Sequence, residues 1–448
     1  MFMLKKSLLV YLTRLLFVGF TLMQAFVSVS RAELTIEITK GSDRALPIAV
    51  VPFANKTGNA IPHDISLIIK NNLQRCGDFD TLPVQRMLSL PDSMSQVFYR
   101  DWRMLGQSYV LVGNVQYVPS SKQYDISFEL IDVVSQSRLA GEIVSTSEIG
   151  LRKAAHYISD IVYQKIMGVK GAFSTKIAYI TRKELVQNKK HEYRLQIADA
   201  DGYGERTLFK SNEPMLSPAW SNDGQHLAYV SFHSGRPAIY IQHVGSAHQR
   251  KLTSFPGLND SPMWSPDDSS LLMTLSKDGN AELYRYDLAT NRVERLTNHY
   301  RIDTEGSWSP DGKRVVFTSD RGGQTQVYQM KLSDLAPQRL TFKGVYNARP
   351  RYSRDGESIY FVHKAESGGG NGFHIASINL KTNEQRVLTS TSLDESPSLA
   401  PNGRMIIYST LRNNKKMLAV VSVDGGAKYF IPSSYGDVLE PAWSPFLD

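Results

Sequence analysis

Residues 191–195 come close to a zinc-binding motif, in which two histidines lie four residues apart and a glutamate follows the first. His191 and Glu192 fit this motif, but Leu195 stands where the second imidazole ligand is required. The segment also alternates polar and apolar residues, which is typical of a strand and not of the helix that such a site needs. We therefore predict no metal at this position.

Motifs for serine hydrolysis and calcium binding are also incomplete. Residues 106–110 and 356–360 begin like the Gly-x-Ser-x-Gly turn of a hydrolase but end in Val110 and Tyr360. Residues 199–202 could begin a calcium loop, yet the twelve-residue ligand pattern does not continue, and a hairpin turn is the better interpretation. The sequence thus predicts no enzyme activity, no cofactor and no metal.

Composition indicates a folded protein without a nucleic-acid partner. Of 448 residues, 42% are hydrophobic and 21% are charged, and 51 Lys and Arg against 43 Asp and Glu give a net charge of +8. Four of the basic residues lie within residues 1–32, which contain no acid, so half of the net charge belongs to that segment. The single cysteine, Cys76, rules out an internal disulfide and a cysteine metal cluster.

The first 32 residues resemble an export signal. Lys5 and Lys6 precede a mostly apolar stretch, residues 15–29, and the small residues Ser30 and Ala32 occupy positions −3 and −1 of a cleavage site. The alternative is a membrane anchor, but the apolar stretch falls short of the roughly 20 residues that a spanning helix needs. We predict cleavage after Ala32 and an exported product that is not inserted in a membrane.

A repeat organises the second half of the chain. Short Pro-x-Trp-Ser-Pro-Asp-Gly-like segments place a large residue at positions 220, 264, 308, 352, 399 and 443, at intervals of 44, 44, 44, 47 and 44. A period in the low forties with several short strands in each unit is typical of β-propeller blades. The longer interval contains residues 368–372, a glycine-rich insertion that lacks the Lys-Ser/Thr of a phosphate loop.

The two ends of the repeat array complement each other. Residues 176–199 supply a unit that lacks its leading Pro-x-Trp strand, and residues 440–448 supply that strand alone. Joining them predicts a six-bladed propeller over residues 173–448 that the C-terminal strand closes, leaving no exposed sheet edges.

The first half has no such repeat and is predicted to form an α/β domain over residues 33–170, so that the whole is a two-domain α+β protein. Apolar and alternating patterns predict strands at residues 47–53, 109–118, 125–131 and 138–145, and helices at residues 62–73, 101–106 and 151–167. Residues 33–38 alternate in polarity and could form either a strand or a mobile arm that awaits a partner.

Several of these segments together resemble the TolB family, the periplasmic components of Tol–Pal systems. The resemblance lies in the export signal, in residues 47–53 and 168–173, in residues 394–403, where Leu399 replaces the repeated Trp, and in residues 441–445. It covers essentially all of residues 33–448. It implies a non-enzymatic periplasmic adaptor that serves outer-membrane integrity, outer-membrane invagination during cell division and the import of foreign proteins.

The resemblance also implies two partners. The lipoprotein Pal would bind the loops that precede the Pro-x-Trp strands, while TolA would bind the arm; we expect a monomer. The Pal-binding residues would be Leu258, Asn259, Asp260, Thr304, Glu305, Tyr346, Asn347, Asp394 and Glu395. The TolA-binding residues would be Glu33, Leu34, Thr35, Ile36, Glu37 and Ile38. Leu258 and Gly306 depart from the family pattern, which has His and Pro there.

Three alternatives remain open at this point. The acidic loop residues, such as Asp303 and Asp394, could simply cap turns, since Asp and Glu are ordinary loop residues. The chain could be a secreted propeller hydrolase or lyase, although no clustered base, nucleophile or metal ligand set is visible. It could also be a receptor that holds a small ligand in the propeller channel.

Overall fold

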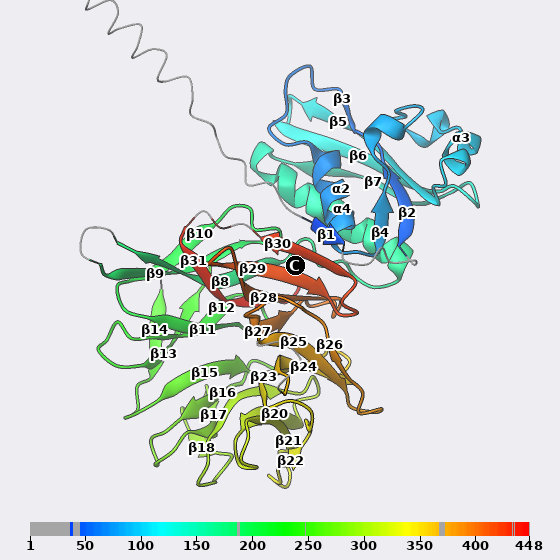
Figure 1. Ribbon diagram of the computed structural model, residues 1–448. Coiled ribbons are helices and arrows are strands. Elements are labelled where there is room, and N and C mark those ends of the chain that lie inside the picture. The colour runs from blue at the N-terminus through cyan, green and yellow to red at the C-terminus, as the bar shows by residue number, and fades with distance from the viewer. Residues whose placement is uncertain are drawn as a thin grey trace, which may run out of the picture. The chain divides into compact units, whose positions relative to one another are not determined.

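The computed structural model describes residues 36–38, 45–185, 189–246, 248–366, 372–431, 433 and 435–447 (Figure 1). The predicted export signal, its cleavage site and most of the glycine-rich insertion lie outside these residues. No helix among the residues described is long and apolar enough to cross a membrane.

The N-terminal part contains one mixed sheet, whose strands lie in the order β4-β2-β5-β6-β7, with β3 also paired to β5. The strands β2, β4 and β5 are parallel, whereas β5, β6 and β7 form an antiparallel meander. Their bounds are β2 Leu46–Val50, β3 Ala54–Asn55, β4 Phe79–Thr81, β5 Tyr109–Val118, β6 Gln123–Asp132 and β7 Ser137–Thr146.

Two helices cover one face of this sheet. Helix α2 (Ile65–Arg75) begins where the Asp64 carboxylate accepts the backbone N–H of Leu67 at 3.0 Å. Helix α4 (Leu151–Met167) ends at Gly168, whose positive φ gives the left-handed cap that glycine adopts without strain. Both helices pack their apolar sides into one core with the sheet, and the short helix α3 (Tyr99–Met104) contributes Trp102 to a second core on the opposite face.

Residues 176–443 form six four-stranded antiparallel blades, as the repeat predicts (Figure 1). The inner strands are β11 Met215–Trp220, β15 Asn259–Trp264, β19 Asp303–Trp308, β23 Tyr346–Tyr352, β27 Glu395–Leu399 and β31 Asp437–Trp443. The second strands are β12 His226–Ser231, β16 Ser270–Leu275, β20 Arg314–Ser319, β24 Ser358–Lys364, β28 Met405–Arg412 and β8 Lys176–Glu184. The third strands are β13 Ala238–His243, β17 Glu282–Asp287, β21 Gln326–Lys331, β25 His374–Asn379, β29 Lys415–Ser422 and β9 His191–Asp199. The outer strands are β14 Gln249–Thr253, β18 Val293–Arg295, β22 Gln338–Arg339, β26 Gln385–Val387, β30 Ala427–Ile431 and β10 Arg206–Ser211.

The ring closes as predicted, because β31 pairs antiparallel with β8 in the blade that also contains β9 and β10. The repeated tryptophans then tie neighbouring blades together. The indole N–H of Trp220 donates to the carbonyl of Ala442, and that of Trp264 donates to the carbonyl of Ala219, both at 3.1 Å. Each of these tryptophans thus bridges two adjacent inner strands.

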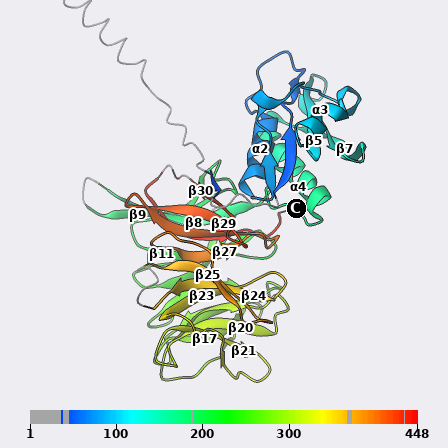
Figure 2. The same ribbon diagram turned by 45° about the vertical axis from the view of Figure 1, so that its right-hand side comes forward.

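One blade carries a fifth strand from the N-terminal end of the chain. Strand β1 (Ile36–Ile38) pairs antiparallel with the outer strand β30, with Ile36 opposite Tyr429 and Ile38 opposite Ala427 (Figures 1 and 2). Of the two alternatives for residues 33–38, a strand and a mobile arm, the structure contains the strand at residues 36–38, and residues 33–35 lie outside the described residues.

Candidate functional site

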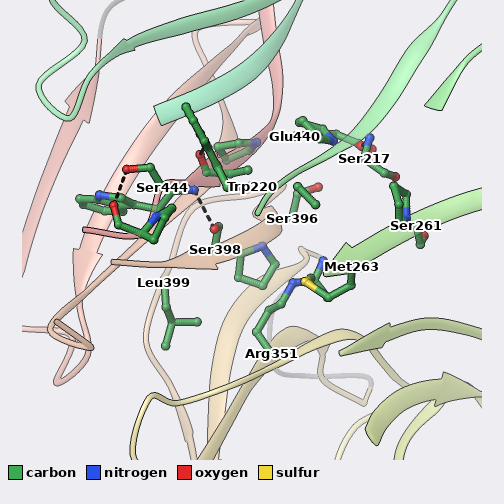
Figure 3. A pocket seen from close by; sticks show the side chains of 18 of the residues that line it. Ser217, Trp220, Ser261, Met263, Arg351, Ser396, Ser398, Leu399, Glu440 and Ser444 are labelled. Atoms are coloured by element: carbon green, nitrogen blue, oxygen red, sulfur yellow. Dashed lines mark hydrogen bonds between the residues drawn. The ribbon is translucent and has the colours of Figure 1, made fainter. Parts of the chain in front are cut away.

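The channel of the propeller is lined by a bulge that recurs in all six inner strands. Each strand contains one non-glycine residue with φ between 49° and 57°, at the point where its pairing register shifts. These residues are Ser217, Ser261, Glu305, Arg349, Ser396 and Glu440. We call them the bulge ring; Figure 3 labels four of them.

Arg349 crosses the channel within the bulge ring. Its Nε lies 3.0 Å from Glu305 Oε1 of the preceding blade, its Nη2 lies 3.2 Å from Glu440 Oε1 two blades further on, and its Nη1 donates to Ser396 Oγ. Burial alone would lower the pKa of Arg349, but the charges of Glu440 and Glu305 outweigh it and raise that pKa. The ring is thus an ion-pair network that spans the channel.

Three of the sequence-predicted site residues are completely buried. The Asn259 amide group contacts Phe255 through both its oxygen and its nitrogen, at 3.0 and 2.8 Å. The side chain of Asn347 bonds to Gln326 and to the carbonyl of Lys343. The Asp394 carboxylate accepts the hydroxyl groups of Thr389, Thr391 and Thr410.

These buried side chains hold the loops before the inner strands in place. Asp303 does the same in its own blade, where its carboxylate is fully buried and bonds to Arg321. Asp303 and Asp394 thus have partners within the propeller, an arginine for Asp303 and threonine hydroxyl groups for Asp394.

The other predicted residues, Leu258, Asp260, Thr304, Glu305, Tyr346 and Glu395, are partly exposed. Burial first, and then the negative charges of Glu305 and Glu395, raise the pKa of Tyr346, so these three side chains lie close enough to interact. Asp260 accepts the Ser217 hydroxyl at 3.0 Å, and burial followed by the charge of Glu440 raises the pKa of Asp260. The six residues lie at the start of inner strands that run in the same direction, so they share one face of the propeller.

Sequence reasoning missed Arg349 and Glu440. The signal was present, because each bulge residue lies immediately before the Pro, or Gly306, that opens the repeated segment. Aligning the repeats at that position would have placed Glu305, Arg349 and Glu440 in one ring.

For the predicted arm, Glu33, Leu34 and Thr35 lie outside the described residues, whereas Ile36, Glu37 and Ile38 form β1. Antiparallel addition to β30 uses backbone hydrogen bonds, which another extended peptide could also form at that edge. The pairing spans three residues only, so this contact is small.

Among the described residues, one group could supply metal ligands: His156, Asp199 and Asp201. Arg152 Nη2 lies 2.5 Å from Asp201 Oδ2, and Arg75 Nη1 lies 3.5 Å from the same oxygen. The two guanidinium groups thus already supply the positive charge that a cation would bring. We interpret the group as an ion-pair network that joins α2 and α4 to the turn after β9.

Comparison with known proteins agrees with this architecture. Sequence profiles of the TolB amino-terminal domain and the TolB beta propeller domain match residues 34–139 and 163–447. The Tol-Pal system protein TolB of Hahella chejuensis is 58% identical over 428 residues, which cover 96% of this chain and 98% of that protein. The corresponding protein of Pseudomonas syringae pv. tomato is 53% identical over 435 residues, covering 97% and 99%. The crystal structure of TolB from Acinetobacter baumannii superposes with a TM-score of 0.84 at 40% identity, covering 92% of this chain and all of that one.

Proposed function

Since the chain belongs to the TolB family of Tol-Pal system proteins, we propose that it is a periplasmic adaptor that joins two partners. The lipoprotein Pal would bind the propeller face that carries Leu258, Asp260, Thr304, Glu305, Tyr346 and Glu395, and TolA would bind residues 33–38. Through these contacts the protein would support outer-membrane integrity and outer-membrane invagination during division. Like its relatives, the chain is a Tol-Pal component and not an enzyme.

The main support for the proposal is that this face combines buried and partly exposed polar side chains. Fully buried polar side chains fix each loop, while neighbouring side chains stay partly exposed around the channel. Loops held in this way around a channel suit a protein partner whose own loop enters the channel, where Glu305 can accept hydrogen bonds. Because Arg349 already fixes the position of Glu305, its carboxylate is oriented before the partner arrives.

Glu305→Gln tests the Pal surface. The amide keeps the volume of the side chain and an oxygen for Thr318 but removes the charge, so we expect Pal binding to weaken by about 1–3 kcal/mol. Isothermal titration calorimetry with purified Pal measures the change.

Glu440→Gln is the matched control, because Glu440 shares Arg349 with Glu305 but belongs to a blade outside the proposed surface. Its affinity for Pal should remain that of the unmodified protein. Equal losses in both variants, or a loss in neither, would remove Glu305 from the Pal surface.

The proposed contact with TolA involves residues 33–38, which include strand β1. Deleting residues 33–38 should abolish binding of TolA in a pull-down experiment while the melting temperature of the propeller stays within a few degrees, because β1 pairs over three residues only. A chain with the same six residues in scrambled order controls for length and charge. Retained TolA binding by the deleted chain would contradict the assignment of the arm.

A further inference from the structure

A second feature of the channel lies on the other side of the bulge ring. A cavity of about 250 Å³ extends from Glu305, Arg349 and Glu440 toward the turns that follow the inner strands, where Asn222 and Arg354 line it. Figure 3 shows this cavity from close by. Its walls come from inner strands and turns of the propeller alone. The cavity therefore shares Glu305 with the face to which the Pal surface is assigned, and its other lining residues lie outside that surface.

Arg351 projects from β23 into this cavity, two residues after Arg349. In the view of Figure 3 its side chain lies between Met263 on one side and Ser398 and Leu399 on the other, and all four residues line the cavity. Burial, the strongest influence, lowers the pKa of Arg351 to about 10, so the guanidinium still carries its charge at neutral pH.

The two arginines differ in their partners. Arg349 has two carboxylates within 3.2 Å, whereas no carboxylate oxygen of the described residues lies within 4.0 Å of the Arg351 guanidinium. The hydrogen bond found for Arg351 runs from Nη1 to the carbonyl of its own neighbour, Pro350, at 2.8 Å. Since a guanidinium has five N–H donors, donors of Arg351 remain for a ligand in the cavity that this residue lines.

The remaining lining combines a hydroxyl group with apolar surface. Ser398 Oγ accepts the backbone N–H of Trp443 at 2.9 Å, which leaves the hydroxyl hydrogen of Ser398 to donate. Met263, Leu399 and Trp220 supply apolar walls. The charged residues of the lining are Arg349, Arg351 and Arg354 against Glu305 and Glu440, so one positive charge is in excess.

We propose that this cavity binds a small organic carboxylate, with Arg351 as the bidentate anchor of its carboxylate group and Met263 and Leu399 against its apolar body. A planar guanidinium fork matches a carboxylate, and the apolar walls favour an anion with a hydrocarbon part over a bare inorganic ion. The cavity is smaller than the roughly 300–1,000 Å³ of sites for drug-sized ligands, so the ligand is of amino-acid size.

Thermal shift and calorimetry with butyrate, isovalerate and glutarate test the proposal on the purified protein. Butyramide, which has nearly the shape of butyrate without its charge, and inorganic phosphate are the comparison probes. We expect at least one carboxylate to bind and to raise the melting temperature, and butyramide and phosphate to bind at least about tenfold more weakly.

Variants locate the binding. Arg351→Met should abolish it, and Arg351→Lys should weaken it at least about tenfold because an ammonium group cannot form the bidentate pair. Met263→Trp should block the cavity without changing any charge, which keeps the test decisive if Arg351→Met unfolds.

Arg386→Met, at an exposed residue paired with Glu384, is the control and should bind like the unmodified protein. Absence of carboxylate binding at 10 mM (about 10-fold above a millimolar Kd), stronger binding of phosphate, or undiminished binding in Arg351→Met and Met263→Trp would overturn the proposal.

Discussion

At the scale of single residues, the buried polar side chains divide into those that are neutralised by a partner and those that stay neutral. His156 belongs to the second kind. It is buried on α4, with Asn72 Nδ2 at 2.9 Å from its Nδ1 and Arg152 Nη2 at 3.4 Å from its Nε2. Burial, the largest influence, lowers the pKa of His156 to about 4; the charge of Asp201 acts against this shift, and the charges of Arg75 and Arg152 add to it.

This lowered pKa predicts a loss of stability in mild acid. Because the folded protein binds the proton of His156 only near pH 4 while the unfolded chain binds it near pH 6.5, the free energy of unfolding falls as the pH drops through that window. Between pH 7 and pH 5 the expected loss is about 2 kcal/mol, from 1.36 kcal/mol per pH unit. Urea denaturation at both pH values measures it.

His156→Gln provides the comparison for this experiment, because a glutamine cannot titrate. The variant should lose less free energy of unfolding between pH 7 and pH 5 than the unmodified protein does. His226→Gln is the control, since His226 is partly exposed on the propeller, where its Nδ1 lies 3.8 Å from Asp223 Oδ2. An identical pH dependence in His156→Gln and the unmodified protein would contradict the prediction.

At the scale of elements, the sequence predicted strands and helices well where a single local pattern decided them. The bounds of β5 and α4 agree with the predicted ones, and Gly168 ends α4 as expected, because periodicity and the capping residue indicate the same boundary. The inner strands were found through their repeat, since Trp and Pro recur at positions that blade packing imposes.

What the sequence did not reveal depends on contacts between distant segments. The pairing of β1 with β30 joins residues almost 400 positions apart, and alternating polarity alone cannot distinguish that edge strand from a free arm. In the same way, the loop residues Asn259, Asn347 and Asp394 look like ordinary polar residues in the sequence. Their burial becomes apparent only in the fold, where Asn347 meets Gln326 of β21, Asp394 meets Thr410 of β28, and Asn259 bonds to the backbone of Phe255 in the preceding loop.

At the scale of the whole molecule, the bulge ring divides the channel into two sites of different character. Toward the loops before the inner strands lie the partly exposed residues to which Pal binding is assigned. Toward the turns after them lies the cavity of Arg351. Because Arg349 contacts Glu305 and Glu440 directly, both sites share one ion-pair network, and both depend on a closed ring of blades.

The closure of that ring rests on the C-terminal strand, so truncation should destabilise the whole propeller. Removing residues 440–448 eliminates Trp443, whose indole N–H bonds to Thr175, and two of the five residue pairs between β31 and β8. Loss of a buried tryptophan alone costs about 3–5 kcal/mol. At about 2–4 °C per kcal/mol for a domain of this size, the melting temperature should fall by about 10 °C or more.

A chain that ends at residue 445 retains β31 and should melt close to the full chain. Because neighbouring blades share apolar contacts around the ring, calorimetry should show the loss of stability in the propeller transition as a whole. An unchanged transition after removal of residues 440–448 would mean that the ring does not need its C-terminal strand.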